Sequence, residues 1–152
     1  MSPILIICCG NADRGDDGAG PLVARHLEAL GIAARVGRGE AFTLMESWRG
    51  ADDVVIVDAV YTGARPGTIR LWDARTAPLV PQWFRCSTHC LGVAEAVGMA
   101  RHLDRLPRRL RIYGIEARRF ETGAKPSAAV VKAAAKVSER LAREVALCTC
   151  VP

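Results

Sequence analysis

Short hydrophobic runs alternate along this chain with longer segments in which hydrophobic residues recur at helical spacing. The first run spans residues 3–9 and stops at Gly10, and another, at 53–60, has a strongly apolar centre. Continuous runs of this length that are rich in β-branched residues are typical of strands buried on both faces of a parallel sheet. We therefore predict a buried parallel strand at each.

The remaining segments complete an alternating order of strands and helices. Residues 67–72 alternate between apolar and polar side chains, which predicts an edge or antiparallel strand. Further strands are predicted at 33–36 and 110–115, and helices at 21–30, 40–48, 91–103 and 126–147. This order builds an α/β three-layer sandwich, with a mostly parallel twisted sheet of about five strands and helices on both faces. We expect one domain over residues 1–152, with 148–152 as a flexible tail.

The composition excludes several classes of protein. Of the 152 residues, 50% are hydrophobic and 24% are charged, which is ordinary for a globular chain and argues against a disordered or fibrous one. The first hydrophobic run is far shorter than the roughly 20 residues that span a membrane. No basic segment of a targeting signal precedes it. We expect a cytoplasmic protein with no membrane partner.

The net charge of +5 comes mostly from arginines that are concentrated in one part of the chain. Such a cluster can bind nucleic acid or an acidic partner. No aromatic residues lie between the arginines as stacking platforms for bases, so we interpret them as a solvated helix end and loop, and expect no nucleic-acid partner. The arginines are Arg101, Arg105, Arg108, Arg109, Arg111, Arg118 and Arg119.

Acidic residues lie at or after the ends of two predicted strands, and a histidine precedes a predicted helix. Asp16 and Asp17 lie in the loop after the first strand, Asp58 lies near the end of strand 53–60, and His89 precedes helix 91–103. In open parallel sheets the functional site lies beyond the carboxyl ends of the strands. We therefore expect these side chains to meet at one edge of the sheet.

Each of these residues alone has a plain structural explanation. Acidic residues at a helix start complement the helix dipole and cap its free amides, an isolated Asp58 suits a turn, and a lone histidine is more often a packing residue than a ligand. Together, Asp17, Asp58 and His89 form a set of two carboxylates and one imidazole. Such a set suits a divalent transition metal and leaves positions open for another molecule.

The glycine-rich loop and the cysteines suggest two other kinds of site, a phosphate site and a metal site with thiolate ligands. The glycine-rich loop after Gly10 lacks the glycine spacing and the Lys-Ser/Thr pair of phosphate-binding loops, and its two carboxylates would repel a phosphate. Thiolate ligands from Cys86 and Cys90 beside His89, or from Cys148 and Cys150, are an alternative metal site. We interpret these cysteines as incidental because none ends a predicted strand and the tail is expected to be mobile.

Six cysteines in a small chain also raise the question of disulfide bonds. Cys8 and Cys9 are adjacent in a hydrophobic run, and a chain of this size with no export signal does not need covalent cross-links. We predict free thiols. A serine protease arrangement is not expected, because Ser87 and His89 are too close in sequence to face each other as a catalytic pair, and Cys90 fails as a nucleophile for a similar reason.

Four motifs, taken in their order along the chain, resemble those of the nickel-iron hydrogenase maturation proteases. The resemblance runs from about Ile4 to about Arg143, and each motif falls at a predicted strand or helix boundary. The motifs are Gly10-Asn11 followed by Asp16-Asp17-Gly18-Ala19-Gly20, Val57-Asp58-Ala59-Val60 followed by Pro66-Gly67, Thr88-His89, and Gly114-Ile115-Glu116 followed by Gly123, Ser127 and Val130.

The resemblance implies a function and a role for each residue. It implies an endopeptidase that removes the C-terminal extension of a hydrogenase large-subunit precursor, in which nickel is already bound and is supplied by that substrate. Asp17, Asp58 and His89 would be the metal ligands and the catalytic residues. Asp16 would orient these ligands or cap the helix. We expect a monomer that forms a transient complex with the precursor.

The chain departs from the family pattern at two positions. Asp13 stands where the family usually has a leucine, which alters the packing of the first loop. Ala117 follows Gly-Ile-Glu where a proline is common after Gly-Ile-Gln. Both changes bear on the loop conformation and on the particular substrate more than on the three expected ligands.

Two alternatives belong to other functional classes. A phosphoacceptor receiver domain also places an acidic pair after its first strand and an aspartate at the end of its third, and Lys125 invites the comparison. However, the acidic pair follows a loop of several residues, and no Ser or Thr ends a recognisable fourth parallel strand. A non-catalytic nickel-binding maturation chaperone would use the same three residues as the protease.

Overall fold

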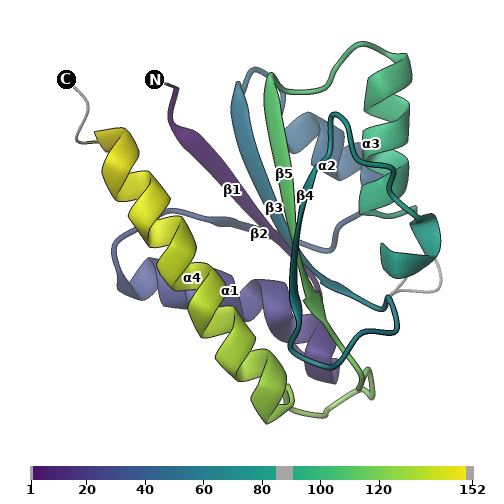
Figure 1. Cartoon of the computed structure of the whole chain (residues 1–152), viewed down its shortest axis with the longest axis vertical. Helices are drawn as coiled ribbons and strands as arrows, with labels where there is room; N and C mark the ends of the chain where they lie inside the picture. The colour runs from purple at the N-terminus through teal and green to yellow at the C-terminus, as the bar shows by residue number, and fades with distance from the viewer. Residues whose placement is uncertain (1, 85–90, 150–152) are drawn as a thin grey trace.

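The computed structural model, which describes residues 2–84 and 91–149, contains one five-stranded sheet with the order β2-β1-β3-β5-β4 (Figure 1). The first four strands in this order are parallel and β4 is antiparallel to β5. The expected mostly parallel sheet and the antiparallel edge strand are therefore both confirmed. The strands are β1 (Ile4–Cys9), β2 (Arg35–Gly37), β3 (Asp53–Val60), β4 (Ile69–Asp73) and β5 (Arg109–Glu116).

Helices cover both faces of this sheet, as expected for a three-layer sandwich (Figure 1). Hydrophobic side chains of β3 alternate between the two layers, so that Val55 and Val57 pack with one pair of helices while Val54 and Ile56 pack with the other. One layer contains α1 (Ala19–Ala29) and α4 (Ala128–Thr149), and the other contains α2 (Ala41–Ser47) and α3 (Val93–His102).

The observed bounds differ from the predicted ones mainly at the ends of elements. The bounds of β3 coincide with the predicted strand, whereas β2 begins two residues later than expected. Glu40 is not in α2 but caps it, because its carboxylate accepts hydrogen bonds from the backbone N–H groups of Phe42 and Thr43. Helix α4 includes Cys148 and Thr149, the first two residues of the segment expected to be a tail.

Two short 3-10 helices were not predicted, η1 (Gly15–Gly18) and η2 (Pro81–Phe84). The first contains both acidic residues that were assigned to the loop after β1. Its four residues are all buried. A single turn of helix has too few residues to show a hydrophobic period, which is why the sequence pattern missed it.

Helix α1 packs unusually close to β1 at Gly20. A side chain at this position would place its Cβ 2.1 Å from the carbonyl oxygen of Cys9, which is far inside van der Waals contact. Glycine is therefore required by the approach of helix and strand, and not by its backbone dihedral angles. This contact fixes the start of α1 relative to the end of β1.

The thiols that the structure describes are free, as predicted. Cys8 and Cys9 are buried in the sheet, and Cys148 lies in α4. Burial raises the pKa of the Cys8 thiol to about 12, so this side chain acts as a small hydrophobic residue.

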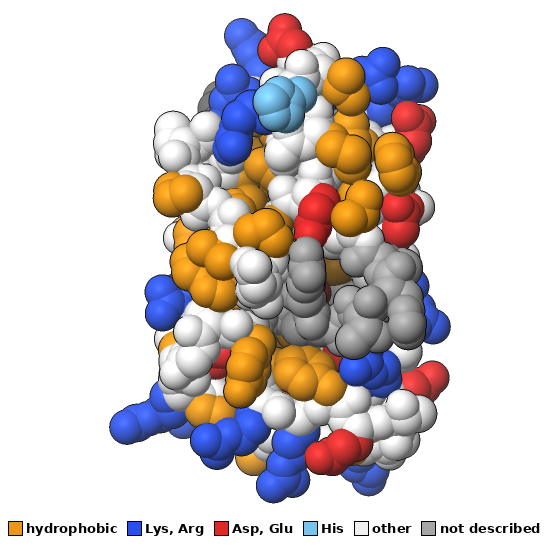
Figure 2. Space-filling model, turned by 90° about the vertical axis from the view of Figure 1, so that its right-hand side faces the viewer, with side chains coloured by type: hydrophobic (Ala, Val, Ile, Leu, Met, Phe, Trp, Pro, Cys, Tyr) orange, Lys and Arg blue, Asp and Glu red, His pale blue; other side chains and the backbone are white. Residues whose placement is uncertain are grey.

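The arginine cluster of the sequence is divided between the two ends of the sheet. Arg109 begins β5, whereas Arg118 and Arg119 follow its end. Arg111 is only 8% exposed and its guanidinium binds Asp53 at 3.3 Å and Glu144 at 2.6 Å. Figure 2 shows Lys and Arg side chains toward both ends of one face. The cluster therefore does not form one continuous basic surface on β5.

Within residues 2–84 and 91–149, no helix is both long enough and apolar enough to cross a bilayer.

We predict that Gly20→Ala lowers the free energy of unfolding by about 1 to 3 kcal/mol, because the new methyl group forces α1 away from β1. Gly98→Ala is the matched control, since Gly98 lies inside α3 with nothing within 4 Å of the added Cβ. This control gains about 0.5 to 1 kcal/mol from helix propensity. Urea unfolding measures both, and equal effects at the two positions would contradict the proposed close contact.

Candidate functional site

The candidate site lies where the chain connections of the sheet diverge. From β1 the chain crosses to β2 on one side, whereas from β3 it continues to the strands on the other side. The ladder between β1 and β3 ends at the pair Cys8 and Val57, so Asp58 lies one residue beyond it. In open α/β sheets, this divergence leaves a crevice at the carboxyl ends of the strands.

Asp58 is a buried carboxyl group on the α2 and α3 side of the sheet. It follows the alternation of β3, in which Ile56 and Val60 contact that layer. Its side chain is only 7% exposed. The pKa of Asp58 is raised well above its usual value because the group is buried and because the Asp17 carboxylate is near, while a backbone hydrogen bond from Ala59 acts in the opposite direction.

Asp17 is the second buried carboxyl group and lies in η1, after the turn that follows β1. It is 5% exposed, and its Oδ2 accepts a hydrogen bond of 3.2 Å from the backbone N–H of Asn11. Burial raises the pKa of Asp17, while the positive charges of Arg14 and Arg38 and the Asn11 bond lower it in part. The structure thus brings Asp17 and Asp58 within electrostatic reach of each other.

Cys9, the last residue of β1, is a third group at this position and was not assigned a role from the sequence. Burial, together with the charges of Asp58 and Asp17, raises its pKa well above the usual value for a thiol. The thiol is therefore held in its neutral form, which is a poor nucleophile. Its position at the end of the first strand was the available signal, and the rule used to select the acids applies to it equally.

Asp16 anchors the segment that carries Asp17 and does not cap the following helix. Its carboxylate does not cap α1, whose N-terminal residue Gly18 has no side-chain cap. Instead it accepts backbone hydrogen bonds from Arg118 (2.9 Å), Arg119 (3.1 Å) and Ser127 (2.7 Å). Burial alone would raise the pKa of Asp16, but these donors outweigh it and lower the pKa. Asp16 thereby ties the segment that carries Asp17 to the loop between β5 and α4.

His89 lies outside the described residues, as do Cys86 and Cys90. The residues on either side of segment 85–90 are anchored at the same end of the sheet. The backbone N–H of Tyr61, directly after β3, donates to the carbonyl of Trp83 at 2.9 Å, and that of Ala41, at the start of α2, donates to Leu91 at 2.9 Å. Among the residues that are described, no three Asp, Glu, His or Cys side chains are placed so that they could hold one metal ion.

Glu116, from the fourth motif, fixes the loop that follows β3. It is 1% exposed, and its carboxylate accepts hydrogen bonds from the backbone N–H of Thr62, at 2.9 and 3.1 Å, and from the Thr62 hydroxyl. This bond ties the loop after Asp58 to the end of β5. The motif residue thus supports the site from outside it.

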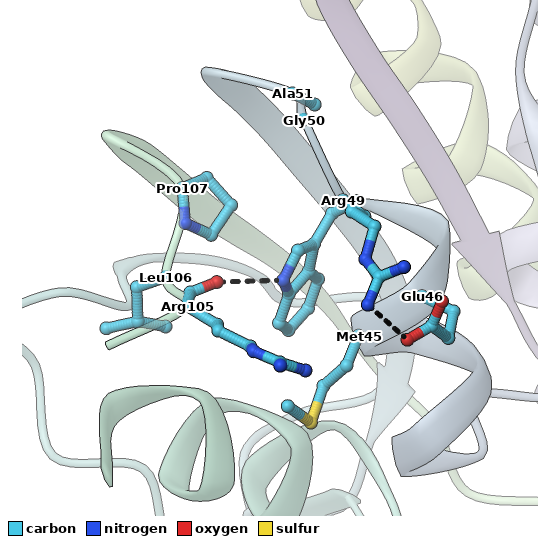
Figure 3. Close-up of a pocket in the computed structure, with 9 residues that line it drawn as sticks. Met45, Glu46, Arg49, Gly50, Ala51, Arg105, Leu106 and Pro107 are labelled. Carbon is cyan, nitrogen blue, oxygen red and sulfur yellow. Dashed lines mark hydrogen bonds and ion pairs between the residues drawn. The ribbon is translucent and has the colours of Figure 1, made fainter. Parts of the chain in front are cut away.

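A separate hollow lies at the opposite end of the sheet and contains neither acid (Figure 3). Its lining comes from the end of α2 and from the chain before β5. The indole N–H of Trp48 donates to the carbonyl oxygen of Arg105 at 3.2 Å, and Arg49 forms an exposed ion pair with Glu46 at 3.5 Å. These contacts close the hollow's walls and bring no reactive group into it.

Comparison with known proteins identifies the same family as the sequence motifs. A family model described as "HycI: Hydrogenase maturation protease" matches residues 38–144. This range includes Asp58 and position 89 but not Asp17. A comparison with curated protein sequences found no match.

Solved structures of similar fold include several maturation proteases. The hydrogenase maturation protease HycI from Thermococcus kodakarensis is 24% identical with a TM-score of 0.70, over 95% of this chain and 92% of that one. The endopeptidase HycI from Escherichia coli is 24% identical with a TM-score of 0.73, over 91% and 88%. The maturating endopeptidase HybD from E. coli is 20% identical with a TM-score of 0.67, over 91% and 89%. At these identities the structures establish the fold that the chain shares with them.

We predict that Asp58→Asn raises the free energy of unfolding of the metal-free protein by about 1 to 2 kcal/mol at about pH 8, because the wild-type side chain must either bury a charge beside Asp17 or take up a proton on folding, and asparagine does neither. The folded-state pKa of Asp58 is raised, so the wild type loses stability as pH rises above the unfolded-state value. The gain should therefore shrink as the pH falls toward about 4. Chemical denaturation at several pH values measures it.

The matched control for this variant is Asp53→Asn at the other end of the same strand. Asp53 pairs with Arg111 and Arg109, so its loss should lower stability by about 1 to 3 kcal/mol. A loss of stability in both variants would show that Asp58 is not in electrostatic conflict with Asp17.

We predict that Asp16→Ala lowers the free energy of unfolding by about 2 to 4 kcal/mol, because three backbone N–H groups lose a charged acceptor. Asp13→Ala, in the same loop but exposed, should change it by less than about 0.5 kcal/mol. Urea unfolding distinguishes the two, and similar small effects would mean that Asp16 does not hold the β5–α4 loop.

Proposed function

The chain belongs to the hydrogenase maturation protease family, and we propose that it removes the C-terminal extension from a nickel-iron hydrogenase large-subunit precursor that already contains nickel. Membership makes it a peptidase. The particular cleavage, the dependence on nickel and the identity of the metal ligands are the proposal. We further propose that it acts as a monomer in a transient complex with the precursor.

The proposal rests on the buried Asp17 and Asp58 pair at the carboxyl end of β1 and β3. Two buried carboxyl groups that lie near each other cannot both ionise without destabilising the fold, unless a cation replaces the proton that one of them would otherwise keep. Arg14 and Arg38 act on Asp17, whereas the charge that acts on Asp58 is that of Asp17 itself. A divalent cation carried in by a substrate would relieve this conflict, and oxygen donors are suitable ligands for it.

In this proposal, Asp17 and Asp58 supply oxygen ligands and His89 supplies a neutral nitrogen to the nickel of the precursor. The metal is then part of the substrate. Its recognition docks the precursor so that the peptide bond beyond its C-terminal cysteine motif lies against the site. A bound metal polarises a carbonyl group or activates water.

The side chains around the acids favour hydrolysis by water over a covalent intermediate. The Cys9 thiol is buried and has a raised pKa, so it is unsuited to attack a peptide bond. Asp16 is committed to three backbone hydrogen bonds and positions Asp17 instead of acting on the substrate.

The two alternative interpretations of the sequence were a receiver domain and a nickel-binding chaperone. A receiver domain has parallel strands in the order 2-1-3-4-5, whereas the fourth strand here is antiparallel and lies at the edge. The sheet of this chain therefore does not have the topology of a receiver domain. A non-catalytic nickel chaperone would use the same acids, and only a cleavage assay separates it from the protease.

The test is cleavage of a nickel-loaded precursor that is co-produced with each variant, with the product's C-terminus determined by mass spectrometry. We expect the wild type to remove a C-terminal peptide, and Asp17→Asn, Asp58→Asn and His89→Ala to lose at least about 100-fold in rate because each removes a proposed ligand. Asp53→Asn, on β3 but away from the site, should retain activity.

Two results would overturn the proposal. If the wild type binds nickel-loaded precursor but leaves every cognate candidate uncut, the chaperone interpretation replaces it. If a precursor without nickel is cut equally well, the acids do not act through the substrate's metal. Circular dichroism of each variant confirms that lost activity does not reflect unfolding.

A further inference from the structure

The two exposed aromatic side chains of this chain both lie at the carboxyl end of the sheet. All eight Phe, Trp and Tyr residues fall within the described ranges, and the other six are buried or half-buried. Phe42 is 62% exposed in the first turn of α2, and Tyr61 is 60% exposed directly after β3. Because exposed aromatic residues are enriched where proteins bind each other, their position indicates a contact surface.

Direct contacts connect Tyr61 to the start of α3. The backbone N–H of Tyr61 donates to the carbonyl of Trp83 in η2 at 2.9 Å. The carbonyl oxygen of Phe84, the last residue of η2, lies 3.5 Å from the place where a Cβ of Gly92 would be. Gly92 directly precedes α3. The short helix η2 therefore bridges the end of β3 and the start of α3.

The start of α3 in turn contacts the start of α2. Leu91 is 49% exposed, and its carbonyl accepts a hydrogen bond of 2.9 Å from the backbone N–H of Ala41. Phe42 directly follows Ala41 in α2. Phe42, Leu91 and Tyr61 thus belong to segments that contact one another, and we call these three side chains the apolar rim.

The apolar rim borders the two buried acids. Tyr61 follows Asp58 by three residues along the chain. On the other flank, the chain that leads to Phe42 passes over the end of β1, since an added Cβ at Gly39 would lie 3.3 Å from the Cβ of Cys9. The Cys9 thiol is within electrostatic reach of both acids. The rim is therefore continuous with the candidate site.

Tyr61 also contacts the loop between β5 and α4. Its ring packs edge-to-face on Phe120 with a centroid distance of 6.4 Å, and the Phe120 carbonyl accepts a hydrogen bond of 3.3 Å from Nε of Arg14. The positive charges of Arg14 and Arg38 act on Asp17. A protein that covers the apolar rim therefore lies beside both acids and their neighbouring arginines.

The protein substrate is the partner that this arrangement favours. Asp17 and Asp58 are only 5% and 7% exposed, so a metal held by another protein reaches them only if that protein lies against the surrounding surface. We propose that the apolar rim binds the hydrogenase large-subunit precursor, with the rings of Phe42 and Tyr61 as its main anchors. This inference rests on the proposed function, which makes the precursor the partner.

The experiment measures cleavage and contact of the nickel-loaded precursor separately. Phe42→Ser and Tyr61→Ser remove the rings, whereas Tyr61→Phe keeps one. Leu30→Ser and Leu103→Ser are matched controls, because these leucines are 60% and 58% exposed but follow α1 and α3 at the other end of the sheet. Steady-state cleavage gives KM and kcat, a photoreactive residue at position 42 detects contact, and circular dichroism confirms the fold of each variant.

We expect Phe42→Ser and Tyr61→Ser each to raise KM by about tenfold with kcat nearly unchanged, because they remove binding and not chemistry. Tyr61→Phe and both leucine controls should keep the KM of the wild type. The photoreactive residue at position 42 should cross-link to the precursor, whereas the same residue at position 103 should not.

Several results would overturn the assignment of the rim. An unchanged KM in both ring-removing variants would do so and leave the protease function intact. An equal rise in KM for the leucine controls would also reject it, because any exposed apolar residue would then have the same effect. Cross-linking of position 42 to a second copy of this chain would assign the rim to self-association. If position 42 cross-links to a precursor that is never cut, the proposed cleavage fails while the rim stands.

Discussion

Electrostatic repulsion between two buried carboxyl groups is the constraint on which the site depends. Asp17 and Asp58 belong to different elements, and each is less than 10% exposed. Burial raises the pKa of Asp58 and the charge of Asp17 raises it further, so the fold holds the two ionised groups together only against their repulsion. Contacts outside the site keep Asp17 and Asp58 in place against this repulsion.

Several contacts provide this resistance from both sides. On one side, Asp16 binds the loop between β5 and α4 through three amide groups, and Gly20 allows α1 to lie directly on β1. On the other side, Glu116 holds the loop after β3 through Thr62. The contacts of Asp16 and Glu116 join segments that are far apart in sequence. The acids are therefore positioned by the complete fold and not by a local loop.

The sequence predicted the sheet and the proximity of Asp17 and Asp58 because both follow from local patterns, whereas the role of the two acids stays a prediction. The hydrophobic run of β3 defined its bounds, and the rule for carboxyl ends of parallel strands selected Asp17 and Asp58. It could not assign Asp16, because its three donors lie more than 100 residues away along the chain and have no pattern of their own. Cys9 was predicted only as a free thiol, although its position at the end of the first strand placed it beside the acids.

The ion pairs of Arg111 lie at the amino end of β3, whereas the acids lie near its carboxyl end. From Asp53 to Asp58 the strand rises about 16 Å, and charges that far apart act weakly on each other in physiological salt. One end of the sheet can therefore gain or lose salt bridges during evolution without altering the electrostatics of the other. Divergent members of such a family are free to adjust their thermal tolerance independently of their chemistry.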